Sequence, residues 1–403
     1  MQSLLTEIFG HDFSQHRDKA SFHAEFFRTK LSITQLAKIH AALVREDSGG
    51  IPASIRISSS NPQEKPFVIL AMLHGNEPAG LAGIVLSMAL ANAGLLQRDI
   101  IGVIGNPLAS RQYFKAYLVS PDSPQESRDA YRCGLAEDGS LLPDMNRIPV
   151  DFLTRSDGSA HTQRARELHA MAQEIWGLTD IHSARGDMVC FTDFKHARDL
   201  RYSPLRRVLV GLSEAIGAHA SAAVSVQTFK TILAPMQHIH SHTGIEAGKH
   251  EAPSAPSVAA SFTLSLLYNL GVTTALPHFT GENGVFEQFL VQPKLSYGDL
   301  IADAPIPTDA KIFMARQTPQ GIIHAQYEEM EAITKGQVVA IAEPAKIALR
   351  APRDFSGIFF SKSGALYDKD PAVGPWPLSA SAMASTKFCY PCVVSEWKLE
   401  WED

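Results

Sequence analysis

The amino-acid sequence predicts an α/β fold followed by a smaller domain built from β-strands. Between about residues 65 and 275, apolar runs that suit buried strands alternate with helix-like segments. After about residue 285 the segments are short and strand-like, with Gly, Pro and Asp between them and no long helix. We therefore expect one domain over residues 1–285 and a β-rich domain with a tail over residues 286–403.

The elements of the first domain follow from local patterns. Residues 1–45 predict a helical N-terminal extension, as in the amphipathic "ITQLAKIHAALVRE". The next stretch, "DSGGIPASIRISSSNPQEKP", alternates and turns, which predicts an edge hairpin. The runs "PFVILAML" and "DIIGVIGNP" predict strands that are covered on both faces. Between them "PAGLAGIVLSMALANAGLL" predicts a helix with Pro78 near its first turn.

Three further helices and a strand are expected downstream, and one of these helices is "PLRRVLVGLSEAIGAHA". "HTQRARELHAMAQEIW" predicts a helix, and "GLTDIH" directly after it predicts a short strand. "FTLSLLYNLGV" predicts the end of another helix, with Gly271 as its C-terminal cap.

Composition and charge exclude several classes of partner. The net charge of -6 and the pI of about 6.2 argue against nucleic acid and membrane surfaces as partners. No apolar run approaches a membrane span, and the first residues lack a basic segment followed by an apolar one, so we expect a cytoplasmic protein. Cys389 and Cys392 form a "CYPC" without a second pair for zinc. Redox use remains open, but two small residues in a C-terminal tail are the favoured interpretation.

The motif "HGNE" places His74 at the end of a strand and Glu77 at the start of a helix. In open α/β sheets the ligand site lies beyond the carboxyl ends of the strands. Two histidines and one glutamate are a typical catalytic zinc set that leaves one position for water. His182, after the strand in "GLTDIH", supplies the third ligand, and Asp180 or Ser183 beside it could orient its ring. Each residue alone has a simpler structural explanation, so the prediction depends on the combination.

Two other motifs predict substrate contacts. In "PDMNRIP", Asn146 and Arg147 can grip a carboxylate, although a turn Asn beside a surface Arg explains the pair in isolation. Glu246 in "TGIEAG" can act as a general base beside zinc, and an ordinary loop glutamate is the alternative.

The string "HIHSH" is a candidate for a second metal site. His238, His240 and His242 alternate, so on a strand they would share one face. A polar strand surface that faces solvent is the favoured interpretation. Neither a G-x-S-x-G, a G-x-G-x-x-G nor an H-E-x-x-H motif occurs, which weakens the hypotheses of a serine hydrolase, a dinucleotide enzyme and a helical zinc protease.

Taken in order, "HGNE", "GNPLA", "DMNR", "DIHSA" and "EAGKH" resemble the succinylglutamate desuccinylase/aspartoacylase family, which is related to the zinc carboxypeptidases. The resemblance implies a zinc-carboxypeptidase-like α/β/α sandwich around a mixed sheet, with a smaller C-terminal β domain. It implies one Zn²⁺ per chain, held by His74, Glu77 and His182. It also implies that Asn146 and Arg147 hold a carboxylate of the substrate.

The resemblance further implies that Glu246 activates water and that an arginine polarises the scissile carbonyl. Where the family usually has this arginine the chain has Lys115, and an insertion precedes "DMNR". Arg132 in "DAYRCG" is our choice for the role, and Arg111 and Arg128 remain alternatives.

The function implied is that of a zinc-dependent amidohydrolase, a deacylase that cleaves the amide bond of an N-acyl amino acid or a similar small molecule with a carboxylate. A metallocarboxypeptidase acting on peptides, an esterase acting on small esters and a non-catalytic relative are the alternatives. We expect a small-molecule substrate and neither nucleic acid nor membrane as partner, and a homo-oligomer is compatible with the sequence.

Overall fold

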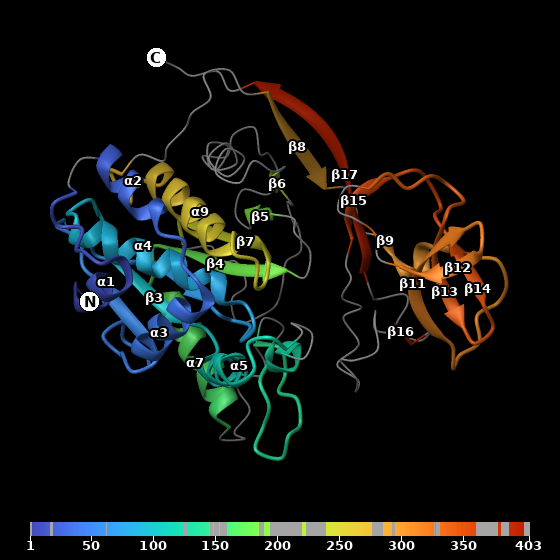
Figure 1. Ribbon diagram of the computed structural model, residues 1–403, viewed down its shortest axis with the longest axis horizontal. Coiled ribbons are helices and arrows are strands. Elements are labelled where there is room, and N and C mark those ends of the chain that lie inside the picture. The colour runs from blue at the N-terminus through green and yellow to red at the C-terminus, as the bar shows by residue number, and fades with distance from the viewer. Residues whose placement is uncertain are drawn as a thin grey trace. The chain divides into compact units, whose positions relative to one another are not determined.

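The chain consists of two compact units, one built from residues before Glu287 and the other from Glu287–Trp397. The computed structural model describes residues 2–16, 19–61, 63–123, 128–145, 148, 153, 159–184, 189–193, 220–222, 239–275, 285–291, 295–325, 327, 331–359, 378–379 and 387–398. Figure 1 labels the elements of both units. The helix expected from "PLRRVLVGLSEAIGAHA" falls outside the described residues, apart from Ala220. That residues 1–285 and 286–403 are separate domains stays a prediction.

The first unit contains a seven-stranded mixed sheet with the strand order β1-β3-β2-β4-β7-β5-β6 (Figure 1). Its strands are β1 (Ser54–Ile57), β2 (Phe67–Ala71), β3 (Ile100–Ile104), β4 (Gly177–Ala184), β5 (Val189–Asp193), β6 (Ala220–Ala222) and β7 (Ser241–Lys249). The four strands β3, β2, β4 and β7 are parallel, whereas β1 is antiparallel to β3 and β5 is antiparallel to β7. The predicted edge hairpin is wrong: within the described residues its segment forms the single edge strand β1, which pairs with β3 instead of with a neighbour in sequence.

Both faces of the central strand β2 are buried, as its continuous apolar run predicts. Phe67 and Ile69 pack into a core on one face of the sheet, and Val68 and Leu70 pack into a second core on the other face. This alternation follows from the two-residue period of a strand. The prediction that strands of this sheet are covered on both sides is confirmed.

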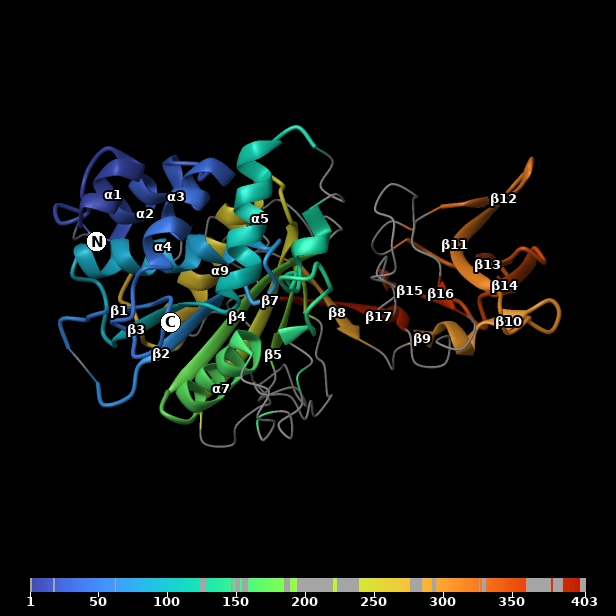
Figure 2. The same cartoon turned by 90° about the horizontal axis from the view of Figure 1, so that it is seen from below.

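Helices cover the two faces unequally (Figure 2). The helices that share the larger core are α1 (Gln2–Phe9), α2 (Lys19–Arg28), α3 (Ile33–Leu43), α4 (Leu81–Asn92), α5 (Pro107–Val119) and α9 (Ala255–Asn269). The other core contains α7 (Ala160–Gln173). Two short 3₁₀ turns, η1 (Pro78–Gly80) and η2 (Asp129–Tyr131), lie near the carboxyl end of β2 and in the insertion before "DMNR". The predicted α/β/α arrangement around a mixed sheet is confirmed.

Two helices begin or end at residues that are typical of helix caps. Ser32 caps α3 in a capping box with Gln35, in which each side chain bonds the backbone N–H of the other residue. Gly271 follows α9 with a φ of +67°, the left-handed conformation expected of a glycine at this end of a helix. None of the helices among the described residues has both the length and the apolar character needed to cross a membrane.

The C-terminal part is antiparallel β-structure, as the sequence predicts. One sheet has the order β10-β14-β13-β11-β12 with β16 beside β11, and another has the order β15-β17-β8 with β9 beside β17. These strands are β8 (Val285–Val291), β9 (Leu295–Ser296), β10 (Ile301–Ala302), β11 (Lys311–Thr318), β12 (Gly321–His324), β13 (Val338–Glu343), β14 (Ile347–Arg350), β15 (Ser356–Phe359), β16 (Leu378–Ser379) and β17 (Lys387–Lys398). Cys389 and Cys392, expected as small residues of the C-terminal tail, lie in the C-terminal strand β17 opposite β15.

Candidate metal centre

His74 and Glu77 lie in a tight turn between the end of β2 and the start of η1. Gly75 allows this turn because a Cβ atom there would lie 2.5 Å from the carbonyl carbon of Ala109 and 2.5 Å from the carbonyl oxygen of Tyr131. The Gly75 N–H donates to the carbonyl of Arg132 at 2.8 Å. The turn therefore packs against the first turn of α5 and against the insertion, and it has no room for a larger residue.

His182 reaches the same point from the neighbouring strand. It lies inside β4, which continues to Ala184, and not after a shorter strand as the sequence suggests. Its Nδ1 lies 2.7 Å from Oε2 of Glu77, and Nδ1 of His74 lies 3.1 Å from Oε1 of the same carboxylate. The two imidazole centroids are 4.9 Å apart. Two imidazoles from separate strands thus converge on one carboxylate.

A second carboxylate contacts the outer nitrogen of each imidazole. Asp180 Oδ2 lies 2.7 Å from Nε2 of His182, and Asp144 Oδ1 lies 3.0 Å from Nε2 of His74. Asp180 is two residues before His182 on β4, so both side chains face the same side of the sheet. Such contacts fix the orientation of a ring and leave its other nitrogen for a metal ion. Of the two orienting residues that the sequence offers, Asp180 touches the ring, whereas the Ser183 hydroxyl bonds Nδ1 of His250 at 2.9 Å.

The site is buried, and its charges determine its pKa values. Burial alone would raise the pKa of the Glu77 carboxyl, but His74, Arg132 and His182 together outweigh burial and hold it well below its usual range. Burial would lower the pKa of His182, but Asp180 and Glu77 outweigh it and raise this pKa well above the usual range. The centre is therefore built around an ionised carboxylate.

The structure brings one of the three candidate arginines to this centre. Arg132 donates from Nη1 to Oε1 of Glu77 at 2.5 Å, and its Nη2 lies 2.9 Å from Nε2 of His74. Arg128 instead forms a bidentate ion pair with Glu251, with bonds of 2.8 and 2.5 Å. Arg111 lies on α5, where it lines a pocket beside His40. Its position therefore makes Arg132 a better candidate than Arg111 or Arg128 for the arginine that polarises the scissile carbonyl.

Glu246 is the direct neighbour of His182 across the β4–β7 pairing. The residues on either side of it, Ile245 and Ala247, point into the larger core, so the half-buried Glu246 faces the opposite side of the sheet. His182 faces that same side, because directly paired residues on adjacent strands do so. Glu246 is thus a strand residue beside the centre and not part of a loop.

The remaining candidate residues lie partly outside the described part of the chain. Asn146 and Arg147 lie outside the described residues, as does His238 of the "HIHSH" string. His240 is exposed and stacks on Trp176 with ring centroids 4.4 Å apart, whereas His242 is buried. The expected polar strand surface is therefore wrong for His242, because the strand enters the interior one step after His240.

The donor set fits a zinc ion. Within the part of the chain that the structure describes, His74, Glu77 and His182 are the one group of three potential ligands whose donor atoms all lie within 4.8 Å of one another. Glu77 contacts the two imidazoles through different oxygens, Oε1 to His74 and Oε2 to His182, so that all three residues present a donor atom to one point. Two imidazoles and one carboxylate are also a typical catalytic zinc set.

Solved structures similar to this chain are succinylglutamate desuccinylase/aspartoacylase and aminoacylase 3 structures. Murine aminoacylase 3 is 14% identical with a TM-score of 0.46, and the match covers 85% of this chain and 98% of that one. A succinylglutamate desuccinylase/aspartoacylase from Rhodobacter sphaeroides is 14% identical with a TM-score of 0.48, over 88% and 93% of the two chains. A succinylglutamate desuccinylase from Vibrio parahaemolyticus is 13% identical with a TM-score of 0.49, over 87% and 88%.

Comparisons of sequence give one short match and no family. No family model matches the chain. The large chain of carbamoyl phosphate synthase from Thermoplasma acidophilum is 32% identical over 113 residues. That match covers 25% of this chain and 10% of the relative, so the chain spans about a tenth of that protein's length.

Sequence reasoning missed one residue at the centre, Asp144. It stands at the start of "DMNR", two residues before Asn146. The signal was present as a carboxylate within a motif already assigned to substrate binding. Its contact with His74, 70 residues earlier in the chain, follows from the path of the insertion and not from any local pattern.

Proposed function

We propose that the chain is a zinc-dependent hydrolase that cleaves the amide bond of an N-acyl amino acid or a similar small substrate with a carboxylate. The observation that carries this proposal is the buried convergence of His74, Glu77 and His182 at the carboxyl ends of parallel strands. A zinc ion bound there supplies Lewis-acid activation of water and of the scissile carbonyl. The substrate class rests on the order of the five sequence motifs.

Glu246 is proposed as the general base. Its place beside His182 on β7 supports this role, because the carboxylate projects from the same side of the sheet as the metal ligand. It takes a proton from the attacking water and passes that proton to the leaving nitrogen. A carboxylate suits both steps because it can gain and lose a proton within one catalytic cycle.

Arg132 is proposed to donate to the carbonyl oxygen as negative charge develops on it. The bond from Arg132 to Glu77 supports this role, since it holds the guanidinium at the edge of the centre, beside the ring of His74. Asn146 and Arg147 are proposed to hold the substrate carboxylate. These two contacts would fix the acyl carbonyl relative to the reacting groups. The energy of binding the carboxylate then serves to align the reacting atoms.

The proposal is tested first by metal content, which does not depend on knowing the substrate. Purified protein should contain about one zinc per chain by atomic emission, because three ligand side chains already converge. His182→Ala should lose the metal, and His169→Ala, which removes a histidine from α7, should retain it. Zinc retained by His182→Ala at the parental stoichiometry would place the metal elsewhere.

Turnover is tested on the zinc-loaded protein with a panel of acylated amino acids, short peptides and small esters. Glu246→Gln should keep its zinc and lose on the order of a hundredfold or more in kcat. Glu137→Gln is the matched control, because Glu137 is exposed in the insertion. A Glu246→Gln variant as fast as the parent would overturn the assignment of the base. Faster cleavage of peptides than of acylated amino acids would favour the carboxypeptidase alternative.

A cytoplasmic location and the absence of nucleic-acid and membrane partners are part of the proposal and rest on composition and charge. Fractionation of the cells that produce the protein tests the location. Assembly into a homo-oligomer is tested by sedimentation of the purified chain.

A further inference from the structure

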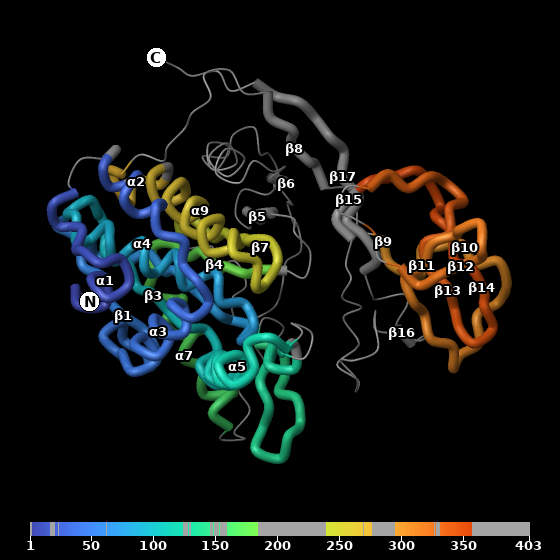
Figure 3. The backbone as a smooth tube through the Cα atoms, viewed as in Figure 1, coloured from blue at the N-terminus to red at the C-terminus, as the bar shows by residue number. Residues whose placement is uncertain are grey.

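A pocket of about 420 Å³ lies between α3 and α5, apart from the metal centre. The two helices run side by side in both views of the first unit (Figures 2 and 3). The residues that line the pocket come from α3 and the turn after it and from α5: Ala37, His40, Ala41, Val44, Arg45, Arg111, Phe114 and Leu118. The volume lies in the range of sites for small organic ligands.

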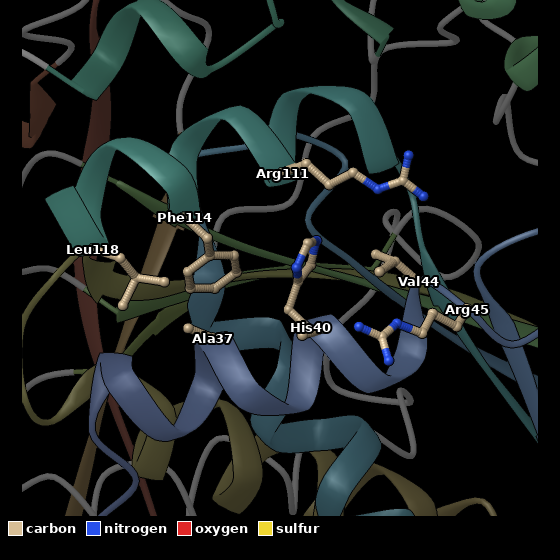
Figure 4. A pocket seen from close by; sticks show the side chains of 8 residues that line it. Ala37, His40, Val44, Arg45, Arg111, Phe114 and Leu118 are labelled. Carbon is tan, nitrogen blue, oxygen red and sulfur yellow. The ribbon is translucent and has the colours of Figure 1, made fainter.

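The pocket is apolar at one end and cationic toward the other (Figure 4). Phe114 and Leu118 lie at the apolar end, and the side chain of Leu118 remains exposed at 57%. The guanidinium groups of Arg45 and Arg111 lie toward the other end, one from each side of the pocket. His40 stands between the two ends.

His40 forms the floor of the pocket and adds no charge to it. Its Nε2 lies 2.7 Å from Oγ of Ser110, and its ring packs on Phe114 with centroids 4.8 Å apart. Burial, with a smaller contribution from Arg111, lowers the pKa of His40 to about 4. The imidazole is therefore neutral at neutral pH, and the positive charge of the pocket comes from the two arginines.

Neither arginine is neutralised by a carboxylate among the described residues. Among the described residues, no carboxylate forms an ion pair with the side chain of Arg45 or Arg111, and both residues are exposed. A guanidinium presents a planar set of donors that matches a carboxylate. Two such groups at the end of an apolar pocket are complementary to an anion that carries a hydrocarbon chain.

We propose that the pocket between α3 and α5 binds a medium-chain carboxylate, with its head group at Arg45 and Arg111 and its alkyl chain along Phe114 and Leu118. The site goes beyond the proposed hydrolase and does not depend on it, because none of its residues belongs to the metal centre. A short path nevertheless links the pocket to the metal centre. His40 bonds Ser110, and the preceding residue, Ala109, packs with its backbone against Gly75 in the turn of the centre.

Isothermal titration of the full-length protein with octanoate tests the proposal, with acetate and 1-octanol as probes that lack the tail or the charge. Octanoate should bind with a stoichiometry of one and more tightly than either probe. Along a series of carboxylates, each added methylene should tighten binding by about two- to fourfold until the chain outgrows the pocket. A fit in which octanoate binds no better than acetate, or in which 1-octanol equals octanoate, overturns the proposal.

Variants locate the site. Arg111→Gln and Arg45→Gln should each raise the Kd for octanoate by roughly three- to tenfold, since a charge-assisted hydrogen bond is lost at an exposed position. Lys115→Gln is the matched control, because it removes one positive charge from the same helix outside the pocket. Ala41→Trp fills the pocket from its exposed side and should abolish binding.

Two results would contradict this location. One is a Lys115→Gln variant that weakens binding as much as Arg111→Gln, which would mean a diffuse charge effect. The other is a protein that binds no octanoate but whose self-association in sedimentation is broken by Ala41→Trp. That result would make the face an interface between copies of the chain.

Discussion

Replacing Arg128 with Met tests which arginine acts on the scissile carbonyl, because the sequence leaves Arg128 as an alternative to Arg132. Arg128 Nε and Nη2 donate to the two carboxylate oxygens of Glu251 at 2.8 and 2.5 Å, and its Nη1 donates to the carbonyls of Ser120 and Ser123. The exposed fractions of the two charged side chains are 4% and 15%. The ion pair is thus nearly enclosed, and it joins the insertion to the segment after β7.

The expected loss of unfolding free energy depends on the partners that Glu251 keeps after the substitution. Met replaces the aliphatic stem of Arg128 but leaves Glu251 with the Tyr113 hydroxyl, 3.0 Å away, as its remaining side-chain donor. Breaking a buried ion pair by removal of one partner costs about 3–5 kcal/mol. Because water still reaches part of Glu251, we expect a loss near the lower end, about 3 kcal/mol of unfolding free energy.

The assay measures urea unfolding at neutral pH and, on the folded zinc-loaded protein, kcat. Arg128→Met should lower stability and leave kcat within about threefold of the parent, since Arg128 does not touch the metal centre. Arg132→Met should instead lower kcat by about 10²–10³ in the variant that folds and binds zinc, where Glu77 keeps both histidines as partners.

The reasoning fails if Arg128→Met slows turnover as much as Arg132→Met without loss of stability. A double-mutant cycle with Glu251→Gln provides a second check, because contacting residues show coupling energies of about 0.5–3 kcal/mol. Additive effects of Arg128→Met and Glu251→Gln would mean that the ion pair contributes nothing to stability.

The other predictions concern pH and the tight turn. Because the pKa of His40 is lowered to about 4, the unfolded chain takes up a proton there at higher pH than the folded chain, and stability should fall as the pH drops below about 6.5. Between pH 7 and 5 the loss is about 2 kcal/mol in urea unfolding, and an unchanged slope in His40→Gln would contradict it. Gly75→Ala should displace the turn from the backbone of Ala109 and weaken zinc binding by at least about tenfold in equilibrium dialysis. Unaltered zinc affinity in that variant would show that the turn has room after all.

Local patterns were sufficient for most elements of the first unit and for the three candidate ligands near the carboxyl ends of β2 and β4. The continuous apolar run of β2, the helix after Pro78 and the strand of His182 all depend on periodicity and turn residues over a few positions. Because parallel strands present their carboxyl ends at one edge, His74, Glu77 and His182 could be expected to converge. The edge hairpin was wrong because the partner of a strand is a long-range choice that composition does not encode.

Contacts across the insertion were decided by tertiary structure alone. Arg132 meets His74 and Glu77 because the insertion returns over the turn, where Gly75 bonds its backbone. Arg128, four residues earlier, is directed instead to Glu251. The spacing of Arg128 and Arg132 in the sequence does not tell which of them reaches the metal centre. That depends on the path of the insertion, which has no regular hydrophobic period.

The sequence by itself determined the alternation of strands and helices in the first unit and the three side chains, His74, Glu77 and His182, that converge there. These depend on hydrophobic periods of a few residues and on a few residue types at strand ends. Only the tertiary structure decided which arginine lies at the centre, that Asp144 contacts His74, and that α3 and α5 line an open pocket with two arginines. Those features arise where side chains from separate segments pack together, and packing is a property of three-dimensional distance that sequence separation does not fix.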